Sequence, residues 1–263
     1  MKVACFTVAA MDFFPQQKKY FAGGNALNQS IRFKQLRHET AFVGAVGIDV
    51  AGEDIRKLLE KNQVNVSHLY RLAGITACNQ IVNDEKGERF GVEGAWKNGV
   101  YGEFVLSESD WQFIQAYEIW STHATGGNYE ATLRQKSKDN FLVVDYLHFD
   151  TYELLEAGKG KVDIAYFGGT EKQYDDLLRL SKEYQSLIVL TCGSGGSYAF
   201  EKGVPHFQKA LPVDKVVDTT GCGDAYQAGF TSEYYQSRNV EKALMAGAEM
   251  GRMATQNLGG VPW

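Results

Sequence analysis

DTTGCGDAY, residues 218–226, is the stretch of this chain that decides its fold. Gly221 and Gly223 flank one small residue, the acid Asp224 follows at once, and a helix-compatible run then begins. Glycine lets backbone N–H groups turn toward one point, because no Cβ blocks the required angles. The same N–H groups open a helix, whose positive end favours an anion. The stretch therefore predicts a tight turn at the start of a helix, shaped to hold a negatively charged group.

Asp224 places a carboxylate beside this anion site. Such a carboxylate can take a proton from an attacking hydroxyl while charge develops on a transferred phosphoryl group. We therefore predict that Asp224 is the general base of a phosphoryl transfer. The competing interpretation is that the glycine-rich loop only caps a helix and that Asp224 only occupies its first turn. Glycine-rich loops before helices are common, so this alternative stays open.

The composition is that of a globular protein. The chain has 263 residues, of which 44% are hydrophobic and 22% are charged, enough for one large α/β domain with a small appendage. The net charge of −5 disfavours broad binding to nucleic acid or to a membrane surface. Residues 3–9 are apolar, but we interpret them as a buried strand rather than a signal peptide, because Asp12 follows closely.

Cysteines and histidines give no sign of a disulfide framework or a zinc site. The four cysteines are scattered without a CxxC pair, which fits a reducing compartment, and the five histidines lack metal-ligand spacing. No apolar run approaches the ~18 residues needed to span a bilayer. We therefore expect a cytoplasmic protein.

Strands and helices alternate along most of the chain. The first expected elements are a strand at 3–9, a helix at 25–37, a strand at 40–47 and a helix at 53–62. After residue 107 the alternation resumes, with strands at 141–146, 162–167 and 187–191, a hairpin at 197–207, and helices near 129–138, 170–184, 223–236 and 240–256. This alternation predicts parallel strands joined by crossover helices.

Between residues 66 and 94 the pattern changes to successive strands. These are expected at 66–72, 75–82 and 88–94, with a hairpin turn at 83–87. We interpret this region as a small β excursion that leaves the main sheet.

Two further glycine sites complete the pattern. Gly23-Gly24 precedes a helix that contains Asn28, and Thr191-x-Gly193-x-x-Gly196 ends a strand. Neither has the spacing of a dinucleotide fingerprint or of a Walker-type P-loop. Together with residues 42–52 and 218–224, they resemble, in the same order along the chain, the signatures of the ribokinase-like sugar kinases, also called the PfkB carbohydrate kinase family.

The resemblance implies a fold and an assembly. The fold is an α/β, three-layer αβα core with a mostly parallel sheet and a small β-sheet lid over the sugar. One kinase domain would cover residues 1–263, with its lid formed by about residues 11–22 and 66–100. Family members often dimerise through their lids, and an exposed sheet edge would favour this, so a homodimer is also implied.

The resemblance also assigns catalytic and sugar-binding roles. Asp224 would be the catalytic base, and the sugar hydroxyls would be held by Asp12, Gly24 and Asn28. The anion hole would be formed by the backbone N–H groups of Gly221, Cys222 and Gly223.

For the nucleotide, the resemblance implies ATP as co-substrate with Mg²⁺. The nucleotide site would be lined by Thr191, Gly193 and Gly196, with Asn257 near the adenine. Glu171 would organise Mg²⁺ indirectly, and Asp218 falls where many members hold a monovalent cation such as K⁺.

The chain departs from the family pattern in several places. Cys222 stands where Ala is usual, and a thiol at a helix N-terminus raises the alternative of a reactive cysteine. Tyr226 replaces Phe. The family's Asn-x-x-Glu motif keeps only its Glu, because Gly168 replaces the Asn, and Asp145 alone remains of an Asp-x-Asn-x-Arg pattern.

Within the family, this sequence is most similar to members that phosphorylate fructosamine adducts of lysine. This implies transfer of the γ-phosphoryl of ATP to the 6-hydroxyl of fructoselysine. Lid aromatics would pack the lysine stem and an acid would meet an ammonium, although the same aromatics would equally serve as lid core. The lid candidates are Phe13, Phe14, Tyr20, Phe21, Phe90, Glu93, Trp96 and Lys97.

The alternatives are another sugar or a nucleoside as acceptor, a non-catalytic sugar-binding regulator and, more distantly, a nicotinamide oxidoreductase. We interpret Arg89 as a solvated charge and His123 and His148 as structural histidines.

Overall fold

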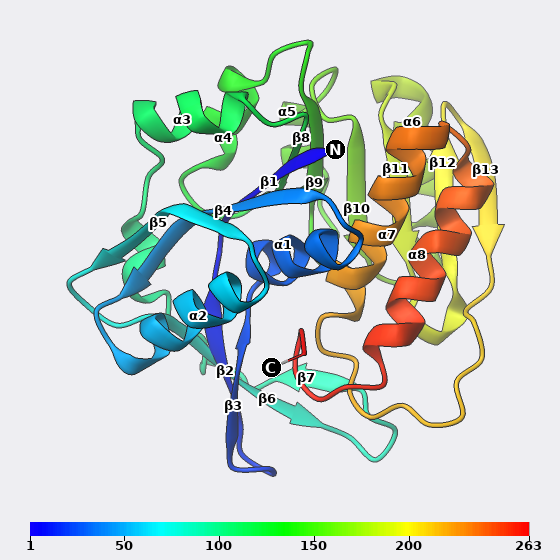
Figure 1. The fold of residues 1–263 in the computed structure, drawn as a ribbon. Helices are drawn as coiled ribbons and strands as arrows, with labels where there is room; N and C mark the ends of the chain where they lie inside the picture. Colours follow the sequence, from blue (N-terminus) through cyan, green and yellow to red (C-terminus); the bar gives the residue numbers. More distant parts are fainter. Residues whose placement is uncertain (263) are drawn as a thin grey trace.

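A nine-stranded sheet forms the centre of the protein, and helices cover both of its faces (Figure 1). The structure is a computed structural model that describes residues 1–262. The strand order is β13-β12-β11-β10-β9-β8-β1-β4-β5, and all neighbours are parallel except β12, which is antiparallel to both β11 and β13. The strands are β1 (Lys2–Thr7), β4 (Glu39–Gly47), β5 (Asn65–Leu72), β8 (Ile119–His123), β9 (Phe141–Asp145), β10 (Ile164–Gly168), β11 (Leu187–Thr191), β12 (Ser197–Glu201) and β13 (Val204–Gln208).

β1 shows why the central strands are almost continuously apolar. Val3 and Cys5 belong to the core on one face of the sheet, whereas Ala4 and Phe6 belong to the core on the other. Successive side chains of a strand point to opposite faces, so a strand covered on both sides must be apolar at every position. The predicted three-layer αβα fold is therefore confirmed.

Each face of the sheet is covered by four α-helices. One core contains residues from α1 (Asn25–Gln35), α2 (Val50–Lys61), α7 (Cys222–Ser237) and α8 (Val240–Ala254). The other contains residues from α3 (Glu108–Gln115), α4 (Tyr129–Gln135), α5 (Glu153–Ala157) and α6 (Tyr174–Tyr184). Short 3₁₀ turns are η1 (Gly99–Glu103), η2 (Glu171–Gln173) and η3 (Gly193–Gly195). Within residues 1–262, none of the helices is long and apolar enough to cross a membrane.

A second, four-stranded sheet lies beyond the main sheet, near the N-terminal end of α7 (Figure 1). Its order is β3-β2-β6-β7, with β2 (Ala10–Phe14), β3 (Lys19–Gly23), β6 (Ala77–Asn83) and β7 (Arg89–Gly91). The chain enters it directly from the carboxyl ends of β1 and β5. The predicted turn at 83–87 joins the antiparallel strands β6 and β7.

The prediction that residues 66–72 leave the main sheet is wrong. They belong to β5, which pairs in parallel with β4 and forms the edge of the nine-stranded sheet. Side chains of this strand are mostly exposed or half-buried. An edge strand faces solvent along one side, so its sequence lacks the apolar run that marks the central strands.

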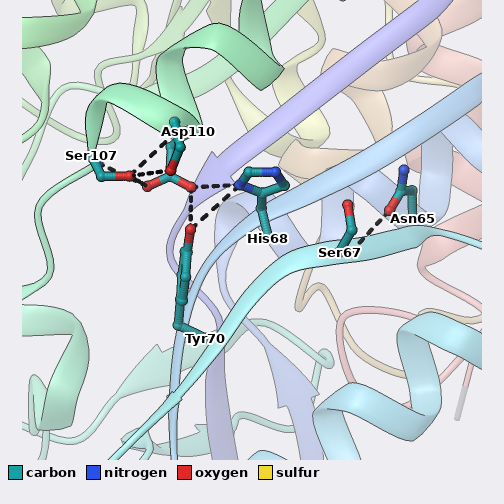
Figure 2. Close-up of polar contacts among 7 residues, drawn as sticks. Asn65, Ser67, His68, Tyr70, Ser107 and Asp110 are labelled. Atoms are coloured by element: carbon teal, nitrogen blue, oxygen red, sulfur yellow. Dashed lines mark hydrogen bonds and ion pairs between the residues drawn. The ribbon is translucent and has the colours of Figure 1, made fainter.

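The buried carboxylate of Asp110 joins β5 to the start of α3, the chain segments before and after β6 and β7 (Figure 2). Asp110, near the start of α3, accepts hydrogen bonds from Tyr70 and bonds to His68 Nδ1, both at 2.7 Å and both on β5. Its other oxygen accepts from the hydroxyl and the amide of Ser107, at 2.6 and 2.8 Å. Burial opposes ionisation of Asp110, but the hydrogen bonds outweigh it and lower the pKa. The cluster therefore ties the edge strand β5 to the start of α3.

Candidate active site

The predicted glycine turn lies at the start of α7. Gly221 caps the helix in the left-handed conformation, with φ of 73°. A Cβ on Gly221 would lie 2.5 Å from the carbonyl oxygen of Gly260, whereas a Cβ on Gly223 would meet nothing within 4 Å. The turn is therefore closed behind by Gly260 and open in front, where an anion can approach the helix N-terminus.

Cys222 is partly buried in this turn. Its amide donates to the Thr219 carbonyl at 3.2 Å. Burial raises the pKa of the Cys222 thiol to about 12, and Asp218 adds to the effect. The alternative of a reactive thiol is therefore not supported, because a raised pKa leaves little of the reactive thiolate at neutral pH.

Two asparagine amides hold the Asp224 carboxylate from the first turn of α1. Asn25 Nδ2 donates to one oxygen at 2.9 Å, and Asn28 Nδ2 donates to the other at 2.7 Å. Residues three apart on a helix lie on the same face, so both amides point the same way. Gly24 makes this approach possible, because at its φ of 98° a Cβ would lie 3.0 Å from the Val8 carbonyl oxygen.

The side-chain amide of Asn25 also bonds to a second carboxylate, that of Asp145. Asn25 Nδ2 also donates to Asp145 Oδ2 at 2.7 Å, and Asp145 Oδ1 accepts from the Leu147 amide at 2.7 Å. Asp145 is buried at the end of β9. A single amide group therefore connects two carboxylates from different parts of the fold.

The surroundings of Asp224 bring its pKa close to neutral pH. Burial raises its pKa to about 6, and the charge of Asp145 adds to this, while the bonds from Asn28 and Asn25 and the charge of Arg89 oppose it. A general base works best when its pKa lies near the working pH. Asp224 therefore has the ionisation that proton removal requires, and it remains partly exposed beside the open side of the turn.

The small sheet presents one face to this site. Strand pairing places Asp12 beside Phe21 and Asn79, and Asn83 beside Arg89. Burial raises the pKa of Asp12 to about 6, and Arg89 opposes the shift. Arg89 also lowers the pKa of Asp145 and of Asp224. Arg89 is exposed, but its charge lowers the pKa of three carboxylates. The interpretation of Arg89 as a merely solvated charge is therefore incomplete.

The hairpin between β6 and β7 contacts the residues that precede the turn. Asn83 Nδ2 donates to Asp218 Oδ1 at 2.7 Å. Thr219 donates its amide to the Gly87 carbonyl at 3.1 Å, and its hydroxyl accepts from the Arg89 amide at 3.0 Å. The small sheet is thus bonded to residues 218–219, directly before the anion-binding turn.

Asp218 is fully buried, and its oxygens are engaged by protein donors. Oδ1 accepts from the amide and the hydroxyl of Thr220 as well as from Asn83, and Oδ2 accepts from the Gly259 amide at 2.8 Å. This donor set stabilises the turn, and it does not fit a monovalent cation held by the carboxylate.

Glu171 is exposed in η2, and one of its oxygens accepts from Tyr198 at 2.7 Å. Within residues 1–262, no three His, Cys, Asp or Glu side chains are grouped to hold a metal ion. Mg²⁺ commonly binds through one or two carboxylates, waters and substrate phosphates. A single exposed carboxylate therefore fits indirect organisation of Mg²⁺.

The predicted nucleotide residues lie near the ends of β11 and α8. Thr191 is the last residue of β11, and Gly193 and Gly196 follow with positive φ values of 54° and 103°. A Cβ on Gly193 would meet nothing within 4 Å, whereas one on Gly196 would lie 3.1 Å from Lys209 Cα. Asn257 follows α8, and its amide lies 3.5 Å from the Met253 carbonyl.

Gly168 leaves room for a histidine ring. His148 Nδ1 lies 2.9 Å from the Gly168 carbonyl oxygen, and a Cβ on Gly168 would lie 2.6 Å from His148 Cε1. The two positions are therefore sterically linked. His123 is buried among Thr7, Tyr101 and Thr125, and burial lowers its pKa to about 4.

Sequence reasoning assigned no role in this site to three of its residues. Asn25 was overlooked although it stands three positions before Asn28 and directly after Gly24, a spacing that predicts two amides on one helix face. Asp145 and Arg89 lie far from the turn in sequence, and only the topology brings them near it.

The chain is similar to known proteins in sequence and in fold. The sequence model described as pfkB family carbohydrate kinase matches residues 14–123 and 127–262. The chain is 25% identical to fructosamine kinase FrlD of Bacillus subtilis over 254 residues, covering 95% of this chain and 89% of that protein. It is 26% identical to fructoselysine 6-kinase of Escherichia coli over 242 residues, covering 90% of each. Among solved structures, Arabidopsis thaliana ribokinase complexed with ribose and ATP has a TM-score of 0.81 and 20% identity, covering 98% of this chain and 92% of that one.

Proposed function

Because the chain belongs to the pfkB family of carbohydrate kinases, we propose that it transfers the γ-phosphoryl group of ATP to the 6-hydroxyl of fructoselysine. A phosphotransferase acting on a sugar hydroxyl is the activity that family membership establishes. The choice of fructoselysine, the sites of ATP and Mg²⁺ and the roles of individual residues are our proposals.

The observation that carries the reaction is the Asp224 carboxylate, fixed by two amides beside the open side of the glycine turn. Asp224 takes the proton of the attacking hydroxyl late in an in-line displacement. The turn and the positive end of α7 stabilise charge on the transferred group. The Cys222 amide is already engaged with Thr219, so we expect Gly221 and Gly223 to contribute more to the anion hole.

Around this centre, Asp12, Gly24 and Asn28 hold the sugar, and the small sheet acts as a lid. Closure of such a lid excludes water, which would otherwise accept the phosphoryl group. Thr191, Gly193, Gly196 and Asn257 line the nucleotide side. Glu171 would organise Mg²⁺ through water, and the ion would neutralise phosphate charge.

Charge supports a substrate that carries an amine. Asp12, Asp145 and Asp224 surround the site, and Arg89 is the cation that acts on all three. Asp224 faces the 6-hydroxyl, and Asp145 is held by Asn25 and Leu147, so Asp12 is the carboxylate left for the amine, which fructoselysine carries at C1. An ammonium group close to Asp12 would be stabilised, whereas ribose or fructose offers it no positive charge. This favours a fructosamine adduct over a simple sugar, and it agrees with the names of the two bacterial relatives.

The test is incubation with ATP, Mg²⁺ and a panel of fructoselysine, fructose, ribose and a nucleoside, followed by mass spectrometry of the products. We expect phosphorylation of fructoselysine at C6. Phosphorylation of another acceptor alone would overturn the substrate assignment, and a failure to phosphorylate any member would overturn the kinase reaction.

Asp224→Asn tests the base within the same assay. We expect kcat to fall by about 10²- to 10⁴-fold, because proton removal is lost, while nucleotide affinity changes little. A variant within tenfold of the wild type would contradict the assignment of Asp224 as base. Lys34→Ala, in the last turn of α1 and far along the helix from Asn25 and Asn28, serves as the control.

A further inference from the structure

Asn25 bridges two carboxylates with one amide group. Its Nδ2 lies 2.7 Å from Asp145 Oδ2 and 2.9 Å from Asp224 Oδ1. An NH₂ group has two hydrogens, so each carboxylate receives one. Asp145 is itself held at its other oxygen by the Leu147 amide. A continuous chain of hydrogen bonds therefore runs from the end of β9, through α1, to the first turn of α7.

The chemistry of the site fixes the orientation of this amide. The reverse orientation would place the Asn25 carbonyl oxygen against two carboxylate oxygens, and an ionised carboxylate cannot donate a hydrogen bond to it. In the observed orientation, Asn25 Oδ1 is buried without a hydrogen-bond partner among the described residues. An unpaired buried acceptor is unfavourable, because it has lost its hydrogen bonds to water without gaining others. The site accepts this cost in order to keep both hydrogens on the carboxylates.

We propose that Asn25 and Asp145 act together as positioning residues for the base, with Asp145 holding Asn25 and Asn25 holding the Asp224 carboxylate toward the acceptor hydroxyl. The proposal rests on the proposed function, because it takes Asp224 as the base. Neither residue needs to touch the substrate for this role.

The two positioning residues have opposite electrostatic effects on the base. The negative charge of Asp145 disfavours ionisation of Asp224, whereas the hydrogen bond from Asn25 favours it. Several other groups face Asp224 from neighbouring elements, and they stay the same in both variants. They are Asp12 on β2, Arg89 on β7, Arg32 on α1, Cys5 on β1 and Cys222 on α7.

Because Asp145 raises the pKa of Asp224 and Asn25 lowers it, replacing each residue should shift the pH profile in opposite directions. Merely structural roles would not produce opposite shifts. In Asp145→Asn, a charge is removed with little change in shape, so the acidic limb of the kcat/KM profile should move to lower pH. In Asn25→Ala, the bond to ionised Asp224 is lost, so the limb should move to higher pH. We expect shifts of about 1 pH unit. We also expect kcat of Asn25→Ala to fall up to about 100-fold, because the base is no longer held in place.

The experiment compares pH profiles of the wild type, both variants and the control Lys34→Ala, with folding checked by thermal unfolding. If Asn25→Ala does not fold, Asn25→Ser keeps one donor hydrogen, and its limb should also move upward. Limbs that do not move, or that move in the same direction, overturn the proposal. A wild type that phosphorylates no acceptor would instead overturn the proposed function, so the two failures are distinguishable.

Discussion

The acids of the site do not stabilise the fold at neutral pH, and Asp12 shows this most clearly. It is 8% exposed, and burial raises its pKa from 3.8 to about 6. Above this pH the carboxylate is ionised in both the folded and the unfolded chain, but only the folded chain bears the desolvation cost. A raised pKa of this size corresponds to about 3 kcal/mol of lost stability at most. As the pH falls through 6 toward 4, the folded state binds the proton first and the cost disappears.

Asp12→Asn should therefore raise the free energy of unfolding at about pH 7.5 by up to ~3 kcal/mol, and the gain should vanish near pH 4. The same change should raise KM for the sugar. Thermal unfolding at the two pH values and steady-state kinetics check both effects. A variant that melts below the wild type at the higher pH would show that the charge of Asp12 is compensated in the fold.

The main coupling between elements joins the small sheet to the anion-binding turn. The hairpin of β6 and β7 reaches residues 218–219 through Asn83, Gly87 and Arg89. Asp218 also accepts the amide and the hydroxyl of Thr220, which directly precedes the turn. The position of the small sheet and the shape of the glycine turn are therefore linked through Asp218.

Asn83→Ala should lower kcat by about 10-fold, because the lid no longer bonds to the buried Asp218 carboxylate. Binding of ATP in the absence of sugar should be nearly unchanged. Stopped-flow or steady-state kinetics, together with calorimetry for ATP, measure the two effects. Lys86→Ala, at the exposed tip of the same hairpin, is the matched control, and an equal loss in that variant would contradict a specific role of Asn83.

Most elements could be predicted from the sequence, because apolar runs and glycine-rich turns mark them directly. The hairpin at Lys202-Gly203 and the start of α7 are examples. β5 was assigned to the wrong sheet, because an edge strand and a lid strand are both half-exposed. Asp224 and Asn28 could be named from their motifs, whereas the bridge from Asn25 to Asp145 depends on the fold bringing the end of β9 to the start of α1, which no local pattern encodes.

At the scale of the whole molecule, the small sheet has an apolar face that the active site does not use. Side chains alternate along a strand, so the face of the small sheet opposite Asp12 and Arg89 carries Phe13, Tyr20 and Phe90. Tyr20 and Phe90 are 60% and 54% exposed, and Phe13 and Tyr20 stack at 4.6 Å. These aromatics therefore point away from the site, which favours a contact with a second copy over a contact with substrate.

We therefore predict a homodimer formed through this face of the small sheet. Light scattering at micromolar concentration should give twice the chain mass, and the double variant Tyr20→Glu, Phe90→Glu should give a monomer, because buried charge would oppose the contact. Phe207→Glu, at an exposed aromatic of β13, should leave the dimer intact. A monomeric wild type would contradict the prediction.

The segment after α8 packs directly against the glycine turn at the start of α7. Gly260 closes the space behind Gly221, its carbonyl accepts from Arg32 at 3.0 Å, and the Gly259 amide bonds to Asp218. An affinity handle or dye is therefore better attached on the N-terminal side of β1 than close behind the segment that follows α8. A protease cut between residues 255 and 261 would abolish turnover while most of the αβα scaffold stays intact.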